Sequence, residues 1–460
     1  MGTVRYGQSM VMKVVVIGAD AAGGSAASQI KRKLRDDVEV TVLEQQQWTS
    51  YAACGIPYWI AGDSEGPNGL VARTPEQHRA NGLELHTETT ATSVDLAAQV
   101  VTVEPTGGGE QRQYSYDHLV FTTGAAAIKP PIPGIDLPGI SQVHTLDDGL
   151  VAIDNLHTNP EDAVVVGAGY VGIEMAEACR LRGLKTTMLD IAPEPLASLD
   201  PDMSALVRQA LTDGGVTLRS GEAATEFREG AQGRVIEVET EKTTVAADIV
   251  FLGVGVRPRT ELAAQAGIEL GASHGLLTNS RQQVLGYENV WAAGDCVESF
   301  DRLTKTPRYV PLGTHANKQG RVVGMNIGRD PAEFAGILGT AITKFLGTEI
   351  SRTGLLEAEA QRLGFDAVSA KVETLTHAGY YPGAEPMTVK LLGERGTGRL
   401  LGGQIVGGAG AGMRIDIVAA ALWGDMRVAD VLDMDLAYAP PFSGAWDPVQ
   451  IAARQLVPKL

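Results

Sequence analysis

Two stretches of the chain repeat one pattern, in which a short apolar run meets a glycine-rich turn and then a helical period. The first apolar run covers residues 13–17 and its turn covers residues 18–24. The second covers residues 163–166, and its turn covers residues 167–172. A buried strand followed by a glycine turn and a helix begins a βαβ unit, so the pattern predicts two such units.

Each unit reaches an acidic residue where its second strand stops. Glu44 follows the predicted strand over residues 38–43, and Asp190 follows the predicted strand over residues 185–189. Both acids lie about 20 residues beyond the turn, where dinucleotide-binding units place the carboxylate that holds a ribose hydroxyl. The sequence therefore predicts two nucleotide sites.

The second turn is a complete G-x-G-x-x-G built from Gly167, Gly169 and Gly172. These positions serve a tight turn, the close approach of a pyrophosphate, and contact between helix and sheet. An acid at position 190 repels a 2′-phosphate, which favours NADH over NADPH.

The first turn is less complete. Gly18 and Gly23 are present, but Asp20 stands where the second glycine belongs, so a carboxylate lies where a phosphate would approach. An ordinary strand–turn–helix is the alternative interpretation of this stretch.

The rest of the chain predicts an α/β protein with two Rossmann-like nucleotide-binding domains, one inserted in the other, and a separate C-terminal α+β domain. Short alternating strands over residues 84–121 return to the first sheet, and so does the strand that ends in Gly294-Asp295. From about residue 331, strands and helices of a different spacing follow. The expected domains are residues 1–150 with 257–330, residues 151–256, and residues 331–460.

One cysteine lies between the first unit and the strands that follow it. Cys54 stands just before the apolar run Ile56–Ala61, which predicts a helix. A cysteine at a helix N-terminus faces unpaired N–H groups, which favour the thiolate and lower the pKa of the thiol. A buried structural cysteine is the alternative, because free cysteine often behaves as a small apolar side chain.

Composition limits the classes of partner. The chain has 460 residues, with 38 basic and 55 acidic side chains and a net charge of −17, which argues against nucleic acid and anionic membranes. No apolar run is long enough to span a bilayer. Three cysteines, at positions 54, 179 and 296, fit a reducing compartment without a disulfide framework. We expect a cytoplasmic protein that acts on a small molecule, with no metal site.

Taken together, these motifs resemble those of the FAD-dependent pyridine nucleotide-disulfide oxidoreductases over essentially the whole chain. The shared motifs include both glycine turns, Ser50-x-x-x-Cys54, Thr122-Thr-Gly124 and Ala293-Gly294-Asp295. The resemblance implies an FAD-binding domain over residues 1–150 and 257–330, and an NAD(P)H-binding domain over residues 151–256 that takes NADH, with NADPH less favoured. It also implies a homodimer formed through a C-terminal α+β dimerisation domain, residues 331–460. The cofactor-binding residues that follow by position are Gly18, Gly23, Glu44, Gly124, Asp295, Gly167, Gly169, Gly172, Glu174, Asp190 and Gly255.

Two positions indicate a branch within that family. In the family that the chain resembles, the two-cysteine disulfide reductases have a second cysteine five residues after the first. This chain has Trp59 at that position. The oxidase and peroxidase members of that family have a histidine in the first glycine turn. This chain has Asp20, Ala21 and Ala22 there. The chain is therefore most similar to the single-cysteine branch, and within it to coenzyme A disulfide reductase.

Three segments carry that last similarity: residues 27–32, residues 379–383 and residues 437–441. The resemblance implies that the first holds the phosphates of coenzyme A, and that tyrosines of the other two reach the substrate sulfur of a partner subunit. A solvated helix face and core aromatics are the alternative interpretations. The implied substrate-binding residues are Gln29, Arg32, Ser50, Asn317 and Arg321, and the implied catalytic residues are Cys54, Tyr438, Tyr381 and Tyr380.

The chain also departs from that pattern. Ala53 replaces an asparagine often found before the cysteine, and Gln77 stands where some members have a basic residue, between Arg73 and Arg79. The expected function is reduction of coenzyme A disulfide, or a related small disulfide or persulfide, by NAD(P)H through FAD and Cys54. One alternative is an NADH oxidase that forms a cysteine sulfenic acid. The other is a redox-responsive flavoprotein whose NADH-bound state is recognised by a partner protein.

Overall fold

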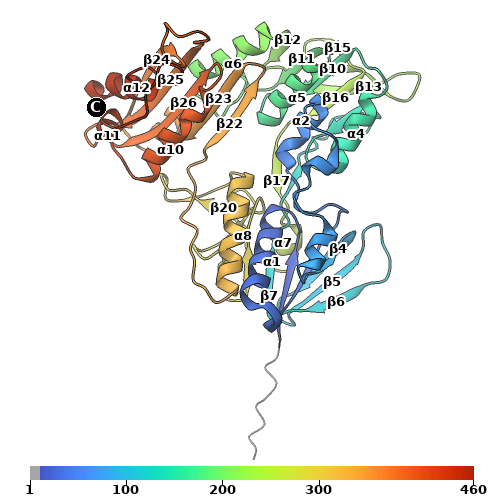
Figure 1. Cartoon of the computed structure of the whole chain (residues 1–460). Helices are drawn as coiled ribbons and strands as arrows, with labels where there is room; N and C mark the ends of the chain where they lie inside the picture. Colours follow the sequence, from blue (N-terminus) through green and yellow to red (C-terminus); the bar gives the residue numbers. More distant parts are fainter. Residues whose placement is uncertain (1–10) are drawn as a thin grey trace, which may run out of the picture.

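The first sheet is parallel and grows outward from β1 at its centre. In the computed structural model, which describes residues 11–460, its strand order is β19–β7–β1–β2–β3. Val14 and Val16 of β1 face one buried cluster while Val15 and Ile17 face another, which explains why the run is continuously apolar. Because β19 follows the second glycine turn in sequence, the chain leaves this sheet and later returns to it (Figure 1).

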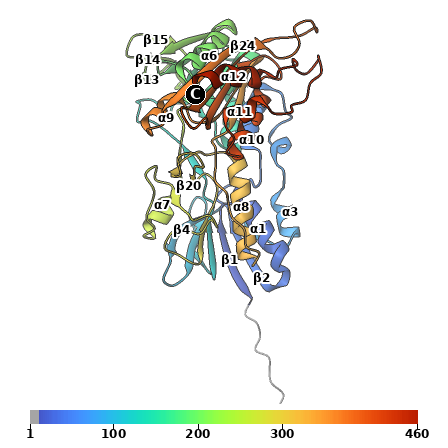
Figure 2. The same cartoon turned by 90° about the vertical axis from the view of Figure 1, so that its left-hand side faces the viewer.

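The elements of the first domain come from two stretches of the chain, one before and one after the inserted second domain. Figure 2 shows α1 and α8 lying side by side along the sheet. The strands are β1 (Met12–Ile17), β2 (Val38–Leu43), β3 (Glu84–His86), β4 (Thr89–Asp95), β5 (Val100–Pro105), β6 (Arg112–Ser115), β7 (His118–Phe121), β8 (Ala125–Ala127), β17 (Val256–Pro258), β18 (Leu276–Leu277), β19 (Val290–Ala292), β20 (Val297–Phe300) and β21 (Pro307–Arg308). The helices are α1 (Ala21–Leu34), α2 (Ile56–Ala61), α3 (Pro75–Ala80), α7 (Glu261–Gln265) and α8 (Gly313–Ile327).

The second sheet repeats the first in the order β12–β11–β10–β16–β9. Its edge strand β9 pairs with β16 in parallel and lies before the expected boundary at residue 151, so we propose that this domain starts near residue 139. The strands are β9 (Ile140–Gln142), β10 (Asp162–Val166), β11 (Lys185–Asp190), β12 (Val216–Ser220), β13 (Ala224–Glu229), β14 (Val235–Thr240), β15 (Thr244–Ala246) and β16 (Ile249–Leu252). The helices are α4 (Leu146–Leu156), α5 (Tyr170–Leu181) and α6 (Pro201–Asp213).

The C-terminal domain is an antiparallel sheet in the order β22–β23–β26–β25–β24, covered by helices. Two parallel nucleotide-type sheets and this third domain confirm the fold class expected from the sequence. The strands are β22 (Ala341–Phe345), β23 (Thr348–Gly354), β24 (Ala367–Leu375), β25 (Pro386–Glu394) and β26 (Leu400–Gly407). The helices are α9 (Glu357–Arg362), α10 (Ile415–Trp423), α11 (Val428–Leu432) and α12 (Pro448–Leu456).

Helix α2 belongs to the first domain by sequence but packs on the second. Its apolar residues Ile56, Trp59 and Ile60 are buried in the cluster formed around β10 and α5. A Cβ on Gly149 of α4 would lie 2.5 Å from the Trp59 ring, so glycine there admits the indole. The helix that follows Cys54 is therefore held by the core of the second domain.

The hairpin of β22 and β23 ties the C-terminal domain to that same core. Phe345, at the end of β22, is 1% exposed and belongs to the buried cluster of the second domain. A Cβ on Gly214 would lie 2.4 Å from its ring. The hairpin is thus anchored by an aromatic side chain inside a neighbouring domain.

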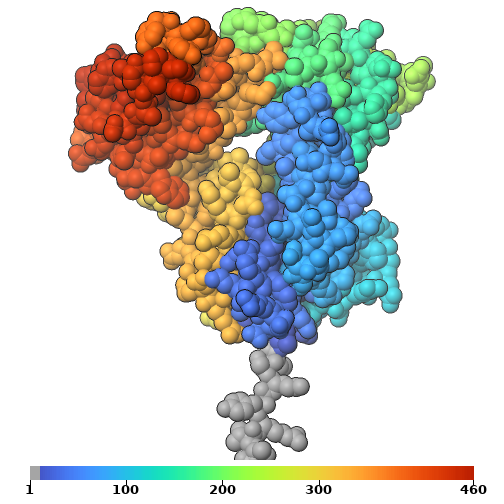
Figure 3. Space-filling model, in the orientation of Figure 1, coloured from blue at the N-terminus to red at the C-terminus, as the bar shows by residue number. Residues whose placement is uncertain are grey.

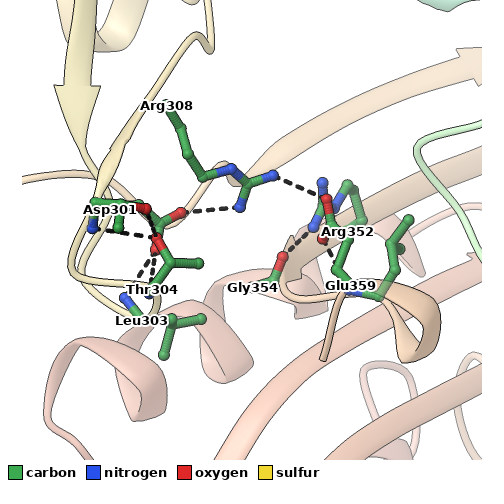
Figure 4. A network of polar contacts seen from close by, with 9 residues as sticks. Asp301, Leu303, Thr304, Arg308, Arg352, Gly354 and Glu359 are labelled. Carbon is green, nitrogen blue, oxygen red and sulfur yellow. Dashed lines mark hydrogen bonds and ion pairs between the residues drawn. The ribbon is translucent and has the colours of Figure 1, made fainter. Parts of the chain in front are cut away.

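A polar network joins the first domain to the third (Figure 4). Asp301 accepts hydrogen bonds from the backbone N–H groups of Leu303 and Thr304 and from Arg308, whose Nη1 lies 2.9 Å from Oδ2. The other guanidinium nitrogen of Arg308 donates to Glu359 of α9 at 3.0 Å. A planar fork that serves two carboxylates fixes both partners in direction as well as distance.

A buried lysine joins the second domain to the third. Lys390 of β25 is 3% exposed, and its Nζ lies 2.9 Å from Asp200, 2.7 Å from Asp202 and 3.1 Å from Glu357. Asp200 also accepts a hydrogen bond from Gln404 and from the backbone of Glu357. One ammonium therefore pairs with three carboxylates that two domains contribute.

We expect Lys390→Met to destabilise this junction by about 3–5 kcal/mol, because removing one partner of a buried ion pair leaves the other charges unpaired. Denaturant unfolding followed by fluorescence measures the change. The matched control is Lys371→Met, since Lys371 contacts Asp202 at 3.1 Å from a side chain that is 37% exposed, and such pairs contribute about 1 kcal/mol or less. Equal effects of the two substitutions would contradict the prediction.

Candidate functional site

Cys54 lies where the first and second domains meet, in a short turn of residues 53–55 directly before α2. Its side chain is exposed, whereas Cys179 and Cys296 are buried. The space-filling view shows a hollow between the C-terminal domain, in orange and red, and the blue segment that carries α2 (Figure 3). Of the three cysteines, Cys54 is the one that a dissolved disulfide can reach.

The sequence predicts a lowered pKa for Cys54, and that prediction is wrong: in the chain without bound ligands the pKa is raised. Partial burial raises the pKa of the thiol, and the carboxylates of Glu174, Asp295 and Asp20 raise it further. The α2 helix has only six residues, and Cys54 precedes it by a turn, so the helix dipole is weak at the sulfur. Burial is the largest cause of the raised pKa, and three acids from separate elements add to it.

Asp20 connects the first glycine turn to the cysteine segment. Its Oδ1 accepts a hydrogen bond from the backbone N–H of Tyr51 at 3.0 Å. Burial, followed by the charges of Glu44 and Asp295, raises the pKa of Asp20 to about 7. The residue that replaces the second glycine therefore binds the loop three residues before Cys54, in addition to its place in the turn.

The first turn has the geometry of a nucleotide site. Gly18 has a φ of 103°, and a Cβ on Gly23 would lie 1.9 Å from the carbonyl oxygen of Gly18. Glu44 ends the neighbouring strand, and its carboxylate accepts the backbone N–H of Ala19 at 2.8 Å. Burial raises the pKa of Glu44, so a ribose hydroxyl that donates to this carboxylate would be favourable.

A second observation supports a polar ligand in the first domain. The buried hydroxyl of Tyr309 has no hydrogen-bond partner among residues 11–460, and burial and then the charge of Asp295 raise its pKa. Buried polar groups are normally hydrogen-bonded, so an unpaired hydroxyl near a buried carboxylate fits a ligand that carries hydroxyl groups. These residues fit FAD.

The second turn is the more regular one. Gly167 has a φ of 101°, a Cβ on Gly169 would lie 4.0 Å from the carbonyl oxygen of Gly253, and a Cβ on Gly172 would lie 1.9 Å from the carbonyl oxygen of Gly167. Asp190 ends β11 and accepts the backbone N–H groups of Ala168 and, at 2.6 Å, Ala192. Each position has the local geometry that a dinucleotide turn requires.

Glu174 lies one turn into α5 and makes contact with the C-terminal domain. Its Oε1 accepts a hydrogen bond from the Thr343 hydroxyl of β22 at 3.0 Å. Burial raises the pKa of Glu174 to about 7, while the Thr343 hydrogen bond and the charge of Lys344 oppose that rise. No local motif in the sequence indicated that β22 reaches this acid.

The residues expected to bind coenzyme A gather along α1 and α8. The hydroxyl of Ser25 donates to Asn317 at 2.9 Å across the two helices, and Gln29 packs against Gly324. Ser50 has a φ of 46°, and its hydroxyl lies 2.9 Å from Nε2 of His78. Burial and the charge of Arg73 lower the pKa of His78 to about 4, so this histidine is neutral at pH 7.

Three arginines on this face have no carboxylate within salt-bridge distance in the described part of the chain: Arg32, Arg73 and Arg321. The guanidinium of Arg73 donates to the hydroxyl of Ser28 at 3.1 Å and so lies against α1. Arg79 differs, because it donates to the carbonyl of Leu85. Unpaired arginines on a protein of net charge −17 are typical of a local anion site.

The three expected tyrosines lie on the C-terminal domain. Tyr380 is 76% exposed, and Tyr381 lies edge-on to His377 with the two ring centres 5.6 Å apart. Their two loops are joined by Arg414, which was not predicted. Its donors reach the carbonyl oxygens of Thr376, Phe442 and Gly410 at 2.6 Å each, and Asp447 at 3.2 Å.

Two family models match the chain. A pyridine nucleotide-disulphide oxidoreductase model matches residues 12–320, and the dimerisation-domain model of the same proteins matches residues 340–449. The first match alone covers more than half of the chain. The protein therefore belongs to the pyridine nucleotide-disulphide oxidoreductases, as the sequence motifs indicated.

Individual relatives are similar over nearly their whole length. The chain is 38% identical over 453 residues, 98% of this chain and 99% of the relative, to an NAD(P)H coenzyme A polysulfide/persulfide reductase of Pyrococcus horikoshii. It is 34% identical to an NADH oxidase of Methanocaldococcus jannaschii (98% and 99% covered) and 27% identical to a coenzyme A disulfide reductase of Staphylococcus epidermidis (95% and 98%). The solved NAD-dependent persulfide reductase from A. fulgidus is 33% identical, with a TM-score of 0.93 over 97% of this chain and 83% of that chain.

Membership of this family makes the protein an NAD(P)H-dependent flavoprotein of disulfide-oxidoreductase type. It confirms the expected cofactors, FAD and a nicotinamide dinucleotide. The match to a dimerisation domain agrees with the expected homodimer. Within residues 11–460 no helix combines the length and the apolar character needed to cross a membrane.

We expect Asp20→Asn to stabilise the protein above pH 7 and to leave it nearly unchanged near pH 4. The folded-state pKa of about 7 exceeds the ordinary value of 3.8 for this side chain, so the folded state holds the proton longer and loses stability as pH rises through this window. Asparagine keeps an acceptor for the N–H of Tyr51 without the charge. The gain at pH 8 should be about 2–4 kcal/mol, and thermal unfolding at pH 4 and pH 8 measures it. A gain of the same size at both pH values would show that ionisation of Asp20 is not its cause.

Proposed function

We propose that the protein reduces the disulfide or persulfide of coenzyme A with electrons from NADH, and that Cys54 is its only redox-active cysteine. The observation that carries the proposal is the exposed Cys54 beside the two glycine turns, with Trp59 buried where a second cysteine would stand. The other two cysteines are buried and cannot form a dithiol with it. A small disulfide from solution is then the partner that fits Cys54.

The chemistry of such a site is a thiol–disulfide exchange. The Cys54 thiolate attacks one sulfur of the substrate, forms a mixed disulfide and releases one thiolate. Two electrons then cleave the mixed disulfide, regenerate the Cys54 thiolate and release the second thiol. Bound FAD supplies the two-electron chemistry that links a nicotinamide to sulfur. Overall, one disulfide, one NADH and one proton give two thiols and NAD⁺.

This chain's residues would divide the binding work among the three domains. Gly18, Gly23, Glu44, Gly124 and Asp295 would hold FAD on the first domain. The second turn, with Glu174, Asp190 and Gly255, would hold NADH. The tyrosine hydroxyls at positions 380, 381 and 438 would donate a proton to the leaving thiolate when a second copy of the chain brings them to Cys54.

An NADH oxidase is the second candidate, because one relative that spans the whole chain is an NADH oxidase. The first turn argues against it, since Ala21 and Ala22 leave no histidine beside the sulfur. Persulfide is included in the first proposal because a relative with 38% identity acts on coenzyme A polysulfide or persulfide.

We expect Cys54→Ser to lose reduction of coenzyme A disulfide at least about 1,000-fold, because the serine hydroxyl is a poor nucleophile at neutral pH. Bound flavin and its reduction by NADH should remain. The measurement is anaerobic NADH consumption with coenzyme A disulfide, with coenzyme A persulfide and with no acceptor. Retained turnover in the variant would remove Cys54 from the mechanism, and NADH consumption that starts only when air is admitted would favour the oxidase.

We expect Arg73→Met to raise the KM for coenzyme A disulfide about 10-fold while kcat is kept, because an unpaired guanidinium beside α1 suits a phosphate. The KM for pantethine, the disulfide of pantetheine, which lacks the phosphates, should not change. Arg79→Met is the matched control, since that side chain turns to Leu85 and pairs with Glu76. If both variants weaken both substrates equally, Arg73 does not recognise phosphate.

A further inference from the structure

A hairpin of the C-terminal domain reaches the acids of α5. Thr343 of β22 donates to Glu174 at 3.0 Å, and the next residue, Lys344, places its Nζ 2.5 Å from Glu177. The backbone N–H of Leu346, in the turn of the same hairpin, donates to Glu177 at 3.0 Å. Three consecutive contacts therefore join one hairpin to two acids on adjacent turns of one helix.

These contacts are fixed in position by burial. Phe345 lies in the core of the second domain at 1% exposure and holds the end of β22. Glu177 is 3% exposed, and its second oxygen, Oε2, has no hydrogen-bond partner among residues 11–460. A buried carboxylate needs a cation close by, and Lys344 is in that position.

Lys344 also faces the cysteine helix. Its Nζ lies 5.8 Å from the centre of the Tyr58 ring, which is within the range of a cation–π contact. Tyr58 follows Cys54 by four residues, and burial followed by the charge of Glu174 raises its pKa to about 12. One lysine from the third domain thus meets side chains on both sides of the α2–α5 contact.

We propose that Thr343 and Lys344 are positioning residues for Glu174, which set the direction and the ionisation of its carboxylate for the nicotinamide nucleotide. The inference rests on the proposed role of Glu174 in NADH binding. An ionised carboxylate accepts a hydrogen bond from an amide N–H more strongly than a carboxylic acid does. The third domain would then tune NADH binding within its own subunit, separately from any role in dimerisation.

The hydroxyl and the ammonium act in the same direction on Glu174. Each favours the charged form, so the loss of either raises the pKa of Glu174. In such a variant Glu174 stays protonated up to a higher pH. The variant therefore loses affinity for NADH over a pH range in which the unchanged protein still binds it. The titratable or charged groups that face Glu174 from neighbouring positions are Cys54, Tyr58, Tyr170, Glu177 and Lys344.

The experiment is the pH dependence of NADH binding to the FAD-loaded protein, from rapid-mixing flavin reduction without a disulfide and from equilibrium binding of NAD⁺. The unchanged protein should show one ionisation near pH 7 that Glu174→Gln abolishes. Thr343→Val and Lys344→Met should each move its midpoint upward by about one pH unit. Thr343→Ser and Lys344→Arg should restore it, and Lys371→Met should leave it in place.

Unmoved midpoints in Thr343→Val and Lys344→Met would overturn the proposal. An unchanged profile in Glu174→Gln would also overturn it, by removing Glu174 from the nucleotide site. Neither result depends on Cys54 or on a disulfide, so failure here is distinguishable from failure of the proposed reductase activity, which Cys54→Ser tests. A loss of binding equal at every pH would indicate a purely structural effect and would count against the proposal.

Discussion

The burial of α2 in the core of the second domain is the constraint on which the rest of the site depends. Ile56, Trp59 and Ile60 lie on a helix that the first domain supplies, yet they are buried among residues of α5 and β10. Each such side chain contributes about 1.5–3 kcal/mol on burial, which is enough to keep a six-residue helix in place. Cys54, directly before this helix, is thereby held between the two nucleotide turns and cannot move with either domain alone.

That placement has an electrostatic consequence. Nucleotide sites need acids for ribose and amide groups, and here the acids of both turns lie within reach of one sulfur. Asp20, Asp295 and Glu174 each raise the pKa of Cys54, although a thiolate is what exchange chemistry requires. The site therefore depends on groups that lessen this negative charge, such as the proton that Asp20 retains up to about pH 7. Burial and these three acids therefore disfavour the thiolate of Cys54 in the chain by itself.

Local pattern was sufficient for the fold and for the cofactor turns. Continuous apolar runs predicted the buried strands, and Gly167 and Gly172 predicted a turn that the backbone adopts, because these features depend on neighbours close in sequence. The ionisation of Cys54 was predicted with the wrong sign because the burial and the acids that raise its pKa come from segments far apart in sequence. Arg414 and Thr343 were missed for the same reason, since neither belongs to a motif and each acts through a contact between distant elements.

The C-terminal domain has two surfaces that bear on the site, one within its own chain and one that faces solvent. Through β22 it contacts Glu174 and Glu177 of its own chain, and through the loops joined by Arg414 it presents tyrosines to solvent. In Figure 1 these loops adjoin α11 and α12, well apart from α2 of the same chain. Exposed aromatic side chains on loops joined by the half-buried guanidinium of Arg414 are costly to order unless they meet a partner. The proposed function requires a second copy of the chain as that partner, because its Cys54 segment would receive the tyrosines while its own hairpin would position Glu174.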